Sequence, residues 1–554
     1  MSSKKLKKYL VAGIPLIMSV IKRLDLKSIL SGHIPSYGNE KFPIADTLLL
    51  LLCNLTLGRQ PLYELEEWVR GIDPKCFEID EESIEVLNDD RFARALDKLY
   101  LADRASLMTQ IVLEMINSID LDLSRIHNDS TTLKAYGKIP GKTLNGLKLA
   151  KGNSKEHRPD LKQLVFTLSI SADGAVPIHF KTYPGNRTDD TTHIETWNTL
   201  CELTGATDFI YVADCKVCTS KQLSHIVTSG GRVITVMPKT WKAYADFIND
   251  LRHMKKKKRR ILRRLIPGKT NEYESFSVFV GDYTTGKGNY TIYWIYSTEK
   301  AKTDLLNREK RIQKARRDLL NLLPRLNKRK LKTEETIKEA VEGVLKKYKV
   351  KNFFDYVISE RYEEYKKKVG RGRPGANTKY ITITDCYYAL SWELDKEVLK
   401  KERDVDGIFP LLTTDRSLSA LEVLKYYKYQ PKLEKRFNQL RSVHEATPLL
   451  FKKIERVEAI MFIFFLALMV QAIIEREVRL KMEERGIESL PIYPEFRDSF
   501  HPTTSKILYT FENIFSYDVL EGENVIEKYK DALTPTQQII LDLLNIPQAD
   551  YWAE

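Results

Sequence analysis

The spacing of apolar residues in the first 120 positions predicts helices. Apolar side chains recur every three or four residues through 44–57, and a second run begins at 61–69. Asn88, Asp89 and Asp90 precede another periodic segment and stand where side chains cap a helix. We therefore expect residues 1–120 to form a helical domain.

The pattern changes to a period of two, or to short apolar runs, over residues 121–240. Segments 163–171 and 176–183 flank Asp173-Gly174, which is a hairpin signal. Further strands are expected at 124–129, 208–214 and 232–238, with a helix at 219–227. This layout predicts an α/β fold around a mixed sheet.

Beyond residue 240, helical and strand patterns alternate. We expect a basic helix in 241–265, strands in 273–297 and 380–414, and helices in 304–348, 419–442 and 536–544. Segment 459–474 is apolar except for Gln471, but its sixteen residues are fewer than the roughly 20 that span a bilayer. Charged residues flank this segment, so we expect a buried core helix and no membrane partner.

Composition then narrows the class of protein. The chain has 554 residues, too many for one core, and its 43% hydrophobic and 30% charged residues exclude a disordered, collagen-like or membrane-embedded chain. The 89 Lys and Arg exceed the 75 Asp and Glu, and the net charge of +14 favours a polyanion, with nucleic acid first. Six cysteines imply no disulfide framework, and the basic start at Met1 lacks the features of a signal peptide. We therefore expect a cytoplasmic location.

Two acids at the ends of predicted strands form the candidate site. Asp129 ends one strand and Asp214 another, and side chains at strand ends converge on one edge of an α/β sheet. Paired carboxylates attract Mg²⁺, and two such ions can activate and stabilise the oxygens of phosphodiester chemistry. The competing interpretation is that each Asp caps a turn or a helix.

Several segments carry a resemblance to bacterial insertion-sequence transposases of the DDE type, whose catalytic core is RNase H-like. Segments 57–69 and 88–100 resemble the helical N-terminal region of that group, and 183–193 resembles its Gly-Asn hairpin end. Segment 127–137 resembles the part that holds the first catalytic Asp, and 209–223 the second. The resemblance, which covers residues 45–475, implies Asp129 and Asp214. Segments 406–415 and 426–442 resemble the third-acid region and imply Glu434.

One subgroup of these enzymes has a Tyr, Arg, Glu, Lys signature on the helix of the third acid. Here Tyr427 and Glu434 match it, Gln430 stands in place of Arg, and Arg441 in place of Lys. The resemblance implies that Tyr427, Gln430 and Arg441 contact DNA, although Gln430 cannot supply the positive charge. Glu445 is a secondary candidate for the third acid.

The long interval between Asp214 and Glu434 predicts an inserted domain. We expect a helical domain for DNA binding or dimerisation (1–120), the first part of an RNase H-like core (121–240), a basic α+β insertion (241–415), the second part of the core (416–480) and a helical C-terminal tail (481–554).

Basic clusters provide candidate DNA contacts. Segment 253–264 has eight Lys or Arg in twelve residues, and we expect its Lys255, Lys256, Lys257, Lys258, Arg259 and Arg260 to bind phosphates. Arg371 and Arg373 lie in an Arg-Gly-Arg-Pro sequence that can enter a minor groove. A solvated helix face and a flexible basic linker are the respective alternatives.

Three other features are interpreted as structural. Cys215 and Cys218 lack a second Cys or His pair for zinc. His127 is expected to pack or to contact substrate, and Asp189 and Asp190 to serve in a turn or cap.

The resemblance predicts an enzyme that cleaves DNA at the ends of its own element and joins them to target DNA. It implies two Mg²⁺ ions, replaceable by Mn²⁺, at Asp129, Asp214 and Glu434. Terminal inverted repeats and target DNA would be its partners, and a homodimer its form in the DNA complex, in the prokaryotic cytoplasm and on the nucleoid. The alternatives are a non-catalytic or decayed DNA-binding derivative, and an RNase H-like nuclease without strand transfer.

Overall fold

The contacts within the chain define two compact units. The computed structural model describes residues 4–553 except 35–39, 41, 59, 136–138, 153–160, 188–191, 254–258, 266–273, 281–289, 329, 376–377, 445 and 447–450. The core unit comprises Met1–Thr235, Thr413–Asp415 and Glu422–Glu554, and the inserted unit comprises Val236–Leu412 and Arg416–Leu421.

The N-terminal part of the core unit is helical, as its apolar period predicts. Its helices are α1 (Ile14–Arg23), α2 (Leu26–His33), α3 (Ile44–Leu57), α4 (Leu65–Arg70), α5 (Glu81–Ile84), α6 (Asp89–Leu101) and α7 (Arg104–Ile119), with 3-10 turns η1 (Leu62–Glu64) and η2 (Pro74–Phe77). Asn88 caps α6, because its Oδ1 accepts a hydrogen bond from the Arg91 amide at 2.9 Å. Strand β1 (Lys4–Leu10) precedes the helices and was not predicted.

The central sheet of the core unit is mixed. Its strands are β2 (Arg125–Ala135), β3 (Ala150–Lys151), β4 (Lys162–Ser171), β5 (Pro177–Pro184), β6 (Ile210–Val212) and β7 (Arg232–Val236). The order is β3-β4-β2-β6-β7, and β5 also pairs with β4. The β2–β4 and β4–β5 pairs are antiparallel, whereas β2–β6 and β6–β7 are parallel. Helix α8 (His193–Thr204) precedes β6, and η4 (Cys215–Val217) and α9 (Ser220–Thr228) follow it.

The turn of the β4–β5 hairpin depends on glycine. Gly174 has φ +71°, and a Cβ there would lie 2.7 Å from the Arg476 side chain. The predicted Asp173-Gly174 turn is therefore confirmed, and any larger residue at 174 meets both backbone strain and a clash.

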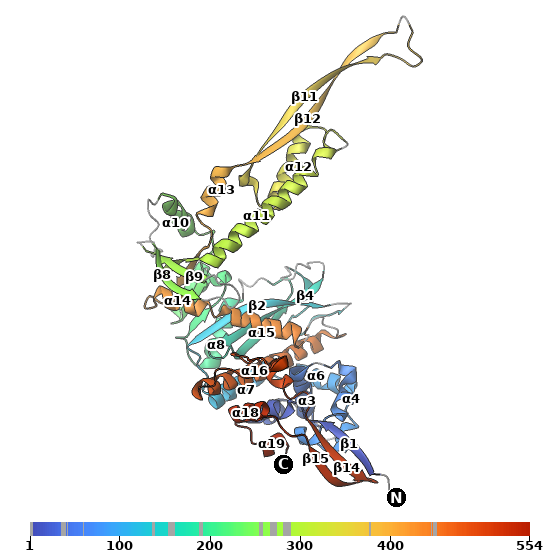
Figure 1. Ribbon diagram of the computed structural model, residues 1–554, viewed down its shortest axis with the longest axis vertical. Coiled ribbons are helices and arrows are strands. Elements are labelled where there is room, and N and C mark those ends of the chain that lie inside the picture. The colour runs from blue at the N-terminus through green and yellow to red at the C-terminus, as the bar shows by residue number, and fades with distance from the viewer. Residues whose placement is uncertain are drawn as a thin grey trace. The chain divides into compact units, whose positions relative to one another are not determined.

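The C-terminal part of the core unit contains the buried helix. Its elements are α14 (Ala420–Tyr427), α15 (Gln430–Ser442), α16 (Ile454–Glu484), η7 (Pro494–Phe496), α17 (Thr504–Tyr509), β14 (Phe515–Glu521), β15 (Asn524–Lys530), α18 (Pro535–Leu543) and α19 (Gln548–Tyr551). Helix α16 is long and apolar enough to cross a membrane, but 94% of its most apolar window is buried among helices and β5 of this unit (Figure 1). This burial confirms the core-helix interpretation. Strands β14 and β15 were not predicted, and β14 pairs with β1.

The inserted unit combines helices with strands. Its elements are α10 (Lys242–His253), β8 (Arg259–Leu265), β9 (Glu274–Phe279), β10 (Thr291–Ser297), α11 (Thr298–Leu320), η5 (Leu323–Arg325), α12 (Glu334–Lys347), η6 (Lys351–Phe353), β11 (Phe354–Lys368), β12 (Tyr380–Leu394), α13 (Lys396–Arg403) and β13 (Ile408–Thr413). The expected helix over 241–265 is wrong in its second half, where β8 pairs antiparallel with β9. Pairing with β9 satisfies the backbone of β8 and leaves Arg259, Arg260 and Arg263 exposed.

Strands β11 and β12 form a long two-stranded arm. Phe354 and Leu390, at its base, are buried in a cluster with apolar residues of α11 and α12. Beyond the base most side chains of the arm are exposed, and Figure 1 shows the ribbon extending past α12.

Candidate functional site

The register of two parallel strands brings Asp129 and Asp214 together. Strand β2 pairs with β6 so that His127 is aligned with Val212. Asp129 follows His127 by two residues inside β2, and not at the end of a strand as expected, while Asp214 follows Val212, the last residue of β6, by two residues. Adjacent strands lie about 4.8 Å apart. The sequence prediction that these acids converge on one part of the sheet is consistent with this alignment.

Local hydrogen bonds hold both aspartates. Asp129 Oδ1 accepts from the Ser130 amide at 2.7 Å. Asp214 Oδ1 accepts from the Lys216 amide at 3.0 Å and so caps η4. The capping role of Asp214 is therefore real, and both carboxylates remain partly exposed to solvent.

Helix α15 places Glu434 alongside strand β2. Gln430 Nε2 donates to the Asn128 carbonyl at 3.1 Å, and Arg441 Nη1 donates to Thr131 Oγ1 at 3.2 Å. The eleven residues from 430 to 441 span about 16 Å of helix, and the strand segment that they contact spans about 10 Å. The helix therefore runs along β2, and Glu434, on the face that carries Gln430 and Arg441, lies between these two attachments.

The phenol of Tyr427 interacts electrostatically with all three acids. Burial, followed by the charges of Asp214, Cys215, Asp129 and Glu434, raises the pKa of Tyr427 to about 12. Electrostatic interaction falls with distance, so the three carboxylates lie within electrostatic range of this side chain. The structure thus brings together residues that are up to 305 positions apart in the sequence.

His193, which was not predicted as a site residue, lies near Asp214. The His193 Nδ1 is 3.0 Å from the Tyr211 hydroxyl, and its Nε2 is 3.9 Å from Asp214 Oδ1. In the tautomer that carries its proton on Nε2, His193 accepts from Tyr211 and points an N–H toward Asp214. Burial, and then the charges of Asp214, Tyr183 and Asp129, raise the pKa of Tyr211 well above its ordinary value. The only sequence signal for His193 was its position at the end of segment 183–193.

The carboxylates of Asp129, Asp214 and Glu434 are chemically suited to magnesium, although they do not form an assembled metal site. Carboxylate oxygens are the ligands that Mg²⁺ prefers, and this ion retains several waters. Among the described residues, no three His, Cys, Asp or Glu side chains form a group that could hold a metal ion. The charges of Asp129, Asp214 and Glu434 all act on Tyr427, but in the described part of the chain these acids do not form one cluster of ligands.

The other predicted DNA contacts of α15 lie at its two attachments. Gln430 is buried, and its Oε1 is 3.0 Å from His127 Nδ1, so both ends of its amide are used within the protein. Arg441 is partly exposed and also donates to Asn438 Oδ1 at 3.0 Å. His127 is fully buried, which agrees with packing, the first of the two roles expected for it.

The predicted basic contacts of the inserted unit are exposed where the structure describes them. Arg259 lies 4.0 Å from the centre of the Tyr296 ring, and Arg260, Arg371 and Arg373 are exposed. Lys255, Lys256, Lys257 and Lys258 lie outside the described residues, as do Asp189, Asp190 and Glu445.

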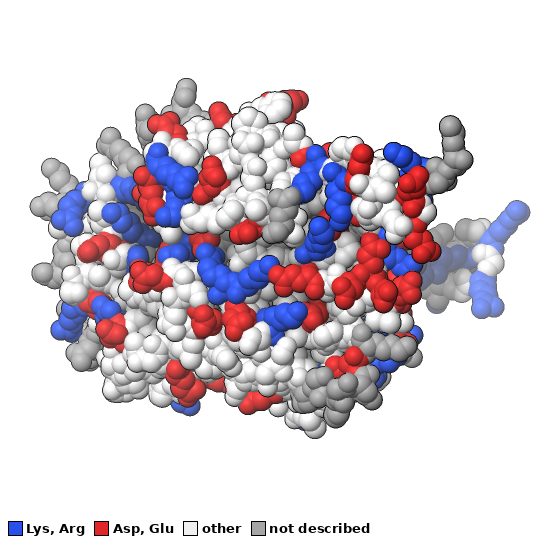
Figure 2. Space-filling view, turned by 90° about the horizontal axis from the view of Figure 1, so that it is seen from below, with Lys and Arg blue, Asp and Glu red and all other residues white. Residues whose placement is uncertain are grey.

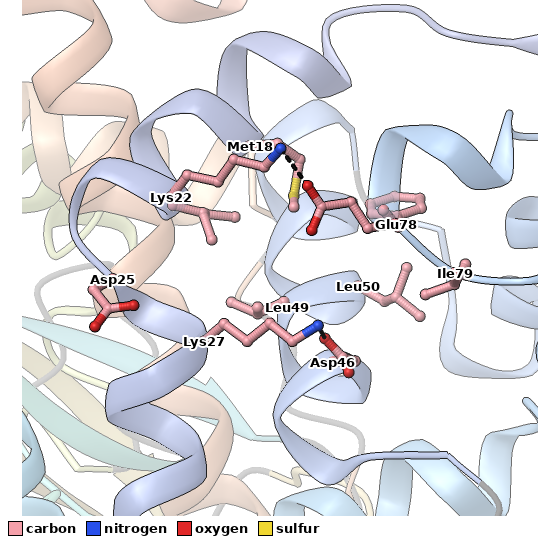
Figure 3. Close-up of a pocket in the computed structure, with 11 residues that line it drawn as sticks. Met18, Lys22, Asp25, Lys27, Asp46, Leu49, Leu50, Glu78 and Ile79 are labelled. Atoms are coloured by element: carbon pink, nitrogen blue, oxygen red, sulfur yellow. Dashed lines mark ion pairs between the residues drawn. The ribbon is translucent and has the colours of Figure 1, made fainter. Parts of the chain in front are cut away.

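A separate pocket among the N-terminal helices carries no comparable chemistry. It has a volume of about 210 Å³ and is lined by Met18, Leu49 and Leu50 among others. Its lysines are neutralised by Glu78 and Asp46, at 2.6 and 2.9 Å (Figure 3). Figure 2 shows a face on which basic and acidic side chains lie side by side, so the positive charge is not gathered there.

Comparisons with known proteins cover the chain unevenly. Residues 6–113 match a family described as a domain of unknown function, DUF4277. No curated protein matches the chain. A solved structure described as a piggyBac transposase synaptic complex with hairpin DNA is similar over 90% of this chain and 79% of that chain, with 8% identity and a TM-score of 0.39. At that identity and TM-score, the similarity assigns neither fold nor function to this chain.

Proposed function

We propose that the protein is a DDE transposase that cleaves DNA at the ends of its own insertion sequence and transfers the strand to target DNA. The observation that carries the proposal is the attachment of α15, which bears Glu434, along β2, which bears Asp129, by hydrogen bonds from Gln430 and Arg441. The charges of Asp129, Asp214 and Glu434 all act on Tyr427, which supports the same grouping. These are the three acids that the sequence resemblance implies, and they lie on strand β2, just after strand β6 and on helix α15 of the core unit. A mixed sheet with α15 beside its central strand supports an RNase H-like core.

The three carboxylates would hold two Mg²⁺ ions, or Mn²⁺ in their place. Bound there, the ions would supply activation of the attacking oxygen and stabilisation of the leaving oxygen in phosphodiester chemistry. The chain's own residues position the acids. The Lys216 amide holds Asp214, and Gln430 and Arg441 fix the position of Glu434 along β2.

The arm of the inserted unit supports DNA as the partner. Residues 366–379, at its end, contain six Lys or Arg and no Asp or Glu. Lys366, Lys367, Lys368, Arg371, Arg373 and Lys379 are the six cations. A major groove admits a two-stranded ribbon, and clustered cations bind phosphates. A homodimer that holds two element ends, acting in the prokaryotic cytoplasm, completes the proposal.

The test uses a labelled duplex that carries the element's end, a supercoiled target plasmid and Mg²⁺. Cleavage at the boundary followed by joining to the plasmid is expected for the wild type, and loss of both for Asp129→Ala and Asp214→Ala. Glu484→Ala, which removes an exposed carboxylate at the end of α16, is the matched control and should remain active. Cleavage without joining would favour a nuclease, and end binding without cleavage would favour a decayed or regulatory DNA-binding protein.

A further inference from the structure

The core unit contains a second cavity, next to a face of α15 other than the one that carries Glu434. It has a volume of about 560 Å³ and opens between the β4–β5 turn, α15, α16 and the segment before α17. Six basic side chains line it: Lys432, Lys435, Arg436, Arg476, Arg479 and His501. Asp173 and Glu475 are the acids of its wall.

The two acids of the cavity are already occupied by arginines. Arg476 Nη2 lies 2.5 Å from Asp173 Oδ2, and Arg436 Nη1 lies 2.9 Å from Glu475 Oε2. Arg479 approaches the same Glu475 oxygen at only 3.5 Å and gives its stronger hydrogen bonds to the Pro502 carbonyl. Five Lys and Arg therefore face two carboxylates, which leaves an excess of three positive charges.

The excess charge is concentrated on Lys432 and Lys435. Within the part of the chain that the structure describes, neither lysine has a carboxylate at ion-pair distance. Both lysines line the cavity together with Arg479. Burial and the same cations, Lys432 first among them, lower the pKa of His501. A bound anion would relieve this mutual repulsion.

The walls of the cavity are fixed before any ligand arrives. Arg436 donates from Nε to the Ala175 carbonyl and from Nη2 to the Gly174 carbonyl, both at 3.0 Å. Glu475 Oε1 accepts from the Thr504 amide at 3.1 Å. The turn, the two helices and the start of α17 are thus joined around the cavity, so that little ordering is needed on binding.

Helix α15 presents the cavity and the candidate acid on different faces. Lys432, Lys435 and Gln439 follow each other at intervals of three and four residues, which places them on one face. Gln430 and Glu434 are four residues apart on another. Lys435 is nevertheless the next residue after Glu434, so a group bound in the cavity lies close to the candidate active site.

We propose that this cavity binds a phosphate group, and that the group is a backbone phosphate of the DNA strand held at the candidate active site. The proposal rests on the proposed function for the source of the phosphate. The unneutralised lysines attract the anion, and the fixed arginines and the opening toward solvent admit one phosphate of a longer strand. The cavity would thus position the DNA beside Glu434 and take no part in the chemical step.

The test measures DNA affinity without metal, so it does not depend on cleavage. A short labelled duplex is titrated with wild type and with Lys432→Ala/Lys435→Ala at several salt concentrations. Lys4→Ala/Lys5→Ala removes the same charge from exposed positions on β1 and is the control. The affinity of the cavity variant should fall several-fold, and its salt dependence should become shallower by about 1 for each phosphate that the variant no longer binds. The control should stay close to wild type.

A second titration, with pyrophosphate alone, distinguishes a backbone phosphate of DNA from a free phosphate as the occupant of the cavity. Pyrophosphate should bind weakly to wild type, compete with the duplex and fail to bind the cavity variant. If the cavity variant loses pyrophosphate binding but keeps the DNA affinity and salt dependence of wild type, DNA is not the occupant of the cavity. Unchanged binding of both probes would overturn the phosphate site itself. Neither result bears on cleavage, which Asp129→Ala tests independently.

Discussion

The amide oxygen of Gln430 lies 3.0 Å from Nδ1 of His127, and both side chains are buried. The amide nitrogen of the same Gln430 donates to the Asn128 carbonyl. One side chain therefore joins the start of α15 to the strand residues that immediately precede Asp129. The Gln that departs from the signature of the resembled subgroup has a hydrogen-bond partner at each end of its amide in this chain.

We expect Gln430→Ala to destabilise the protein by about 1–3 kcal/mol, because it leaves the His127 donor and the Asn128 carbonyl buried without partners. Cleavage should fall as well, since Glu434 lies four residues along the helix. Urea unfolding and the cleavage rate measure the two effects. Gln548→Ala, at an exposed position of α19, should change stability by less than about 0.5 kcal/mol. Equal stability of the two variants would contradict the attachment.

The burial of His127 predicts a dependence of stability on pH. Burial lowers the pKa of His127 from 6.5 to about 4, so the unfolded chain binds the proton more readily than the folded one. The stabilisation is complete above pH 6.5 and is lost as pH falls from 6.5 toward 4, by up to about 3 kcal/mol. Urea unfolding across this range should show a shallower loss for His127→Gln. Parallel curves for the two proteins would rule this cause out.

Arg436 and Glu475 should stabilise the folded protein as a pair, and not as independent residues. Both side chains are about 95% buried, with a separation of 2.9 Å. Arg436→Leu should cost about 3–5 kcal/mol, because it leaves Glu475 charged and buried without its main partner. Arg436→Leu/Glu475→Leu should recover part of this loss in denaturant unfolding. Additive losses in the double variant would show that the two residues act independently.

The arm of the inserted unit should contribute to DNA affinity without affecting stability. Arg371 and Arg373 are exposed near its end, so Arg371→Ala/Arg373→Ala should leave the unfolding transition unchanged. The salt dependence of duplex binding should become shallower by up to about 2, one for each phosphate that the two arginines bind. Fluorescence anisotropy at several salt concentrations measures this slope. A slope equal to that of wild type would exclude phosphate binding by this pair.

Much of the core unit could be predicted because its signals are local. The hairpin at Asp173-Gly174, the cap at Asn88 and the apolar segment around Gln471 each act through neighbours in the sequence. Strand β8 could not be predicted in this way. Its arginines have the composition of a solvated helix, and only pairing with β9, from a later part of the chain, makes it a strand.

The candidate site could likewise be predicted only where its signals are local in the sequence. Asp214 follows a recognisable strand and Asp129 was expected at the end of one, so their approach could be expected from sequence. Strand β2 nevertheless continues past Asp129 to Ala135, because it pairs with β4, from a later part of the chain. The attachment of Gln430 to His127 joins residues 303 positions apart, and no local pattern indicates it. The cavity beside Lys432 and Lys435 needs four elements at once, and its lysines have the sequence pattern of an ordinary solvated helix face.

Glu434 is proposed to complete a metal-dependent site for DNA cleavage. The most direct measurement compares wild type with Glu434→Ala on a labelled duplex that carries the element's end, with Mg²⁺ or Mn²⁺ present and absent. We predict metal-dependent nicking at the element boundary by wild type, and its loss in Glu434→Ala with duplex affinity and the unfolding transition unchanged. Nicking by Glu434→Ala at the wild-type rate would contradict the account.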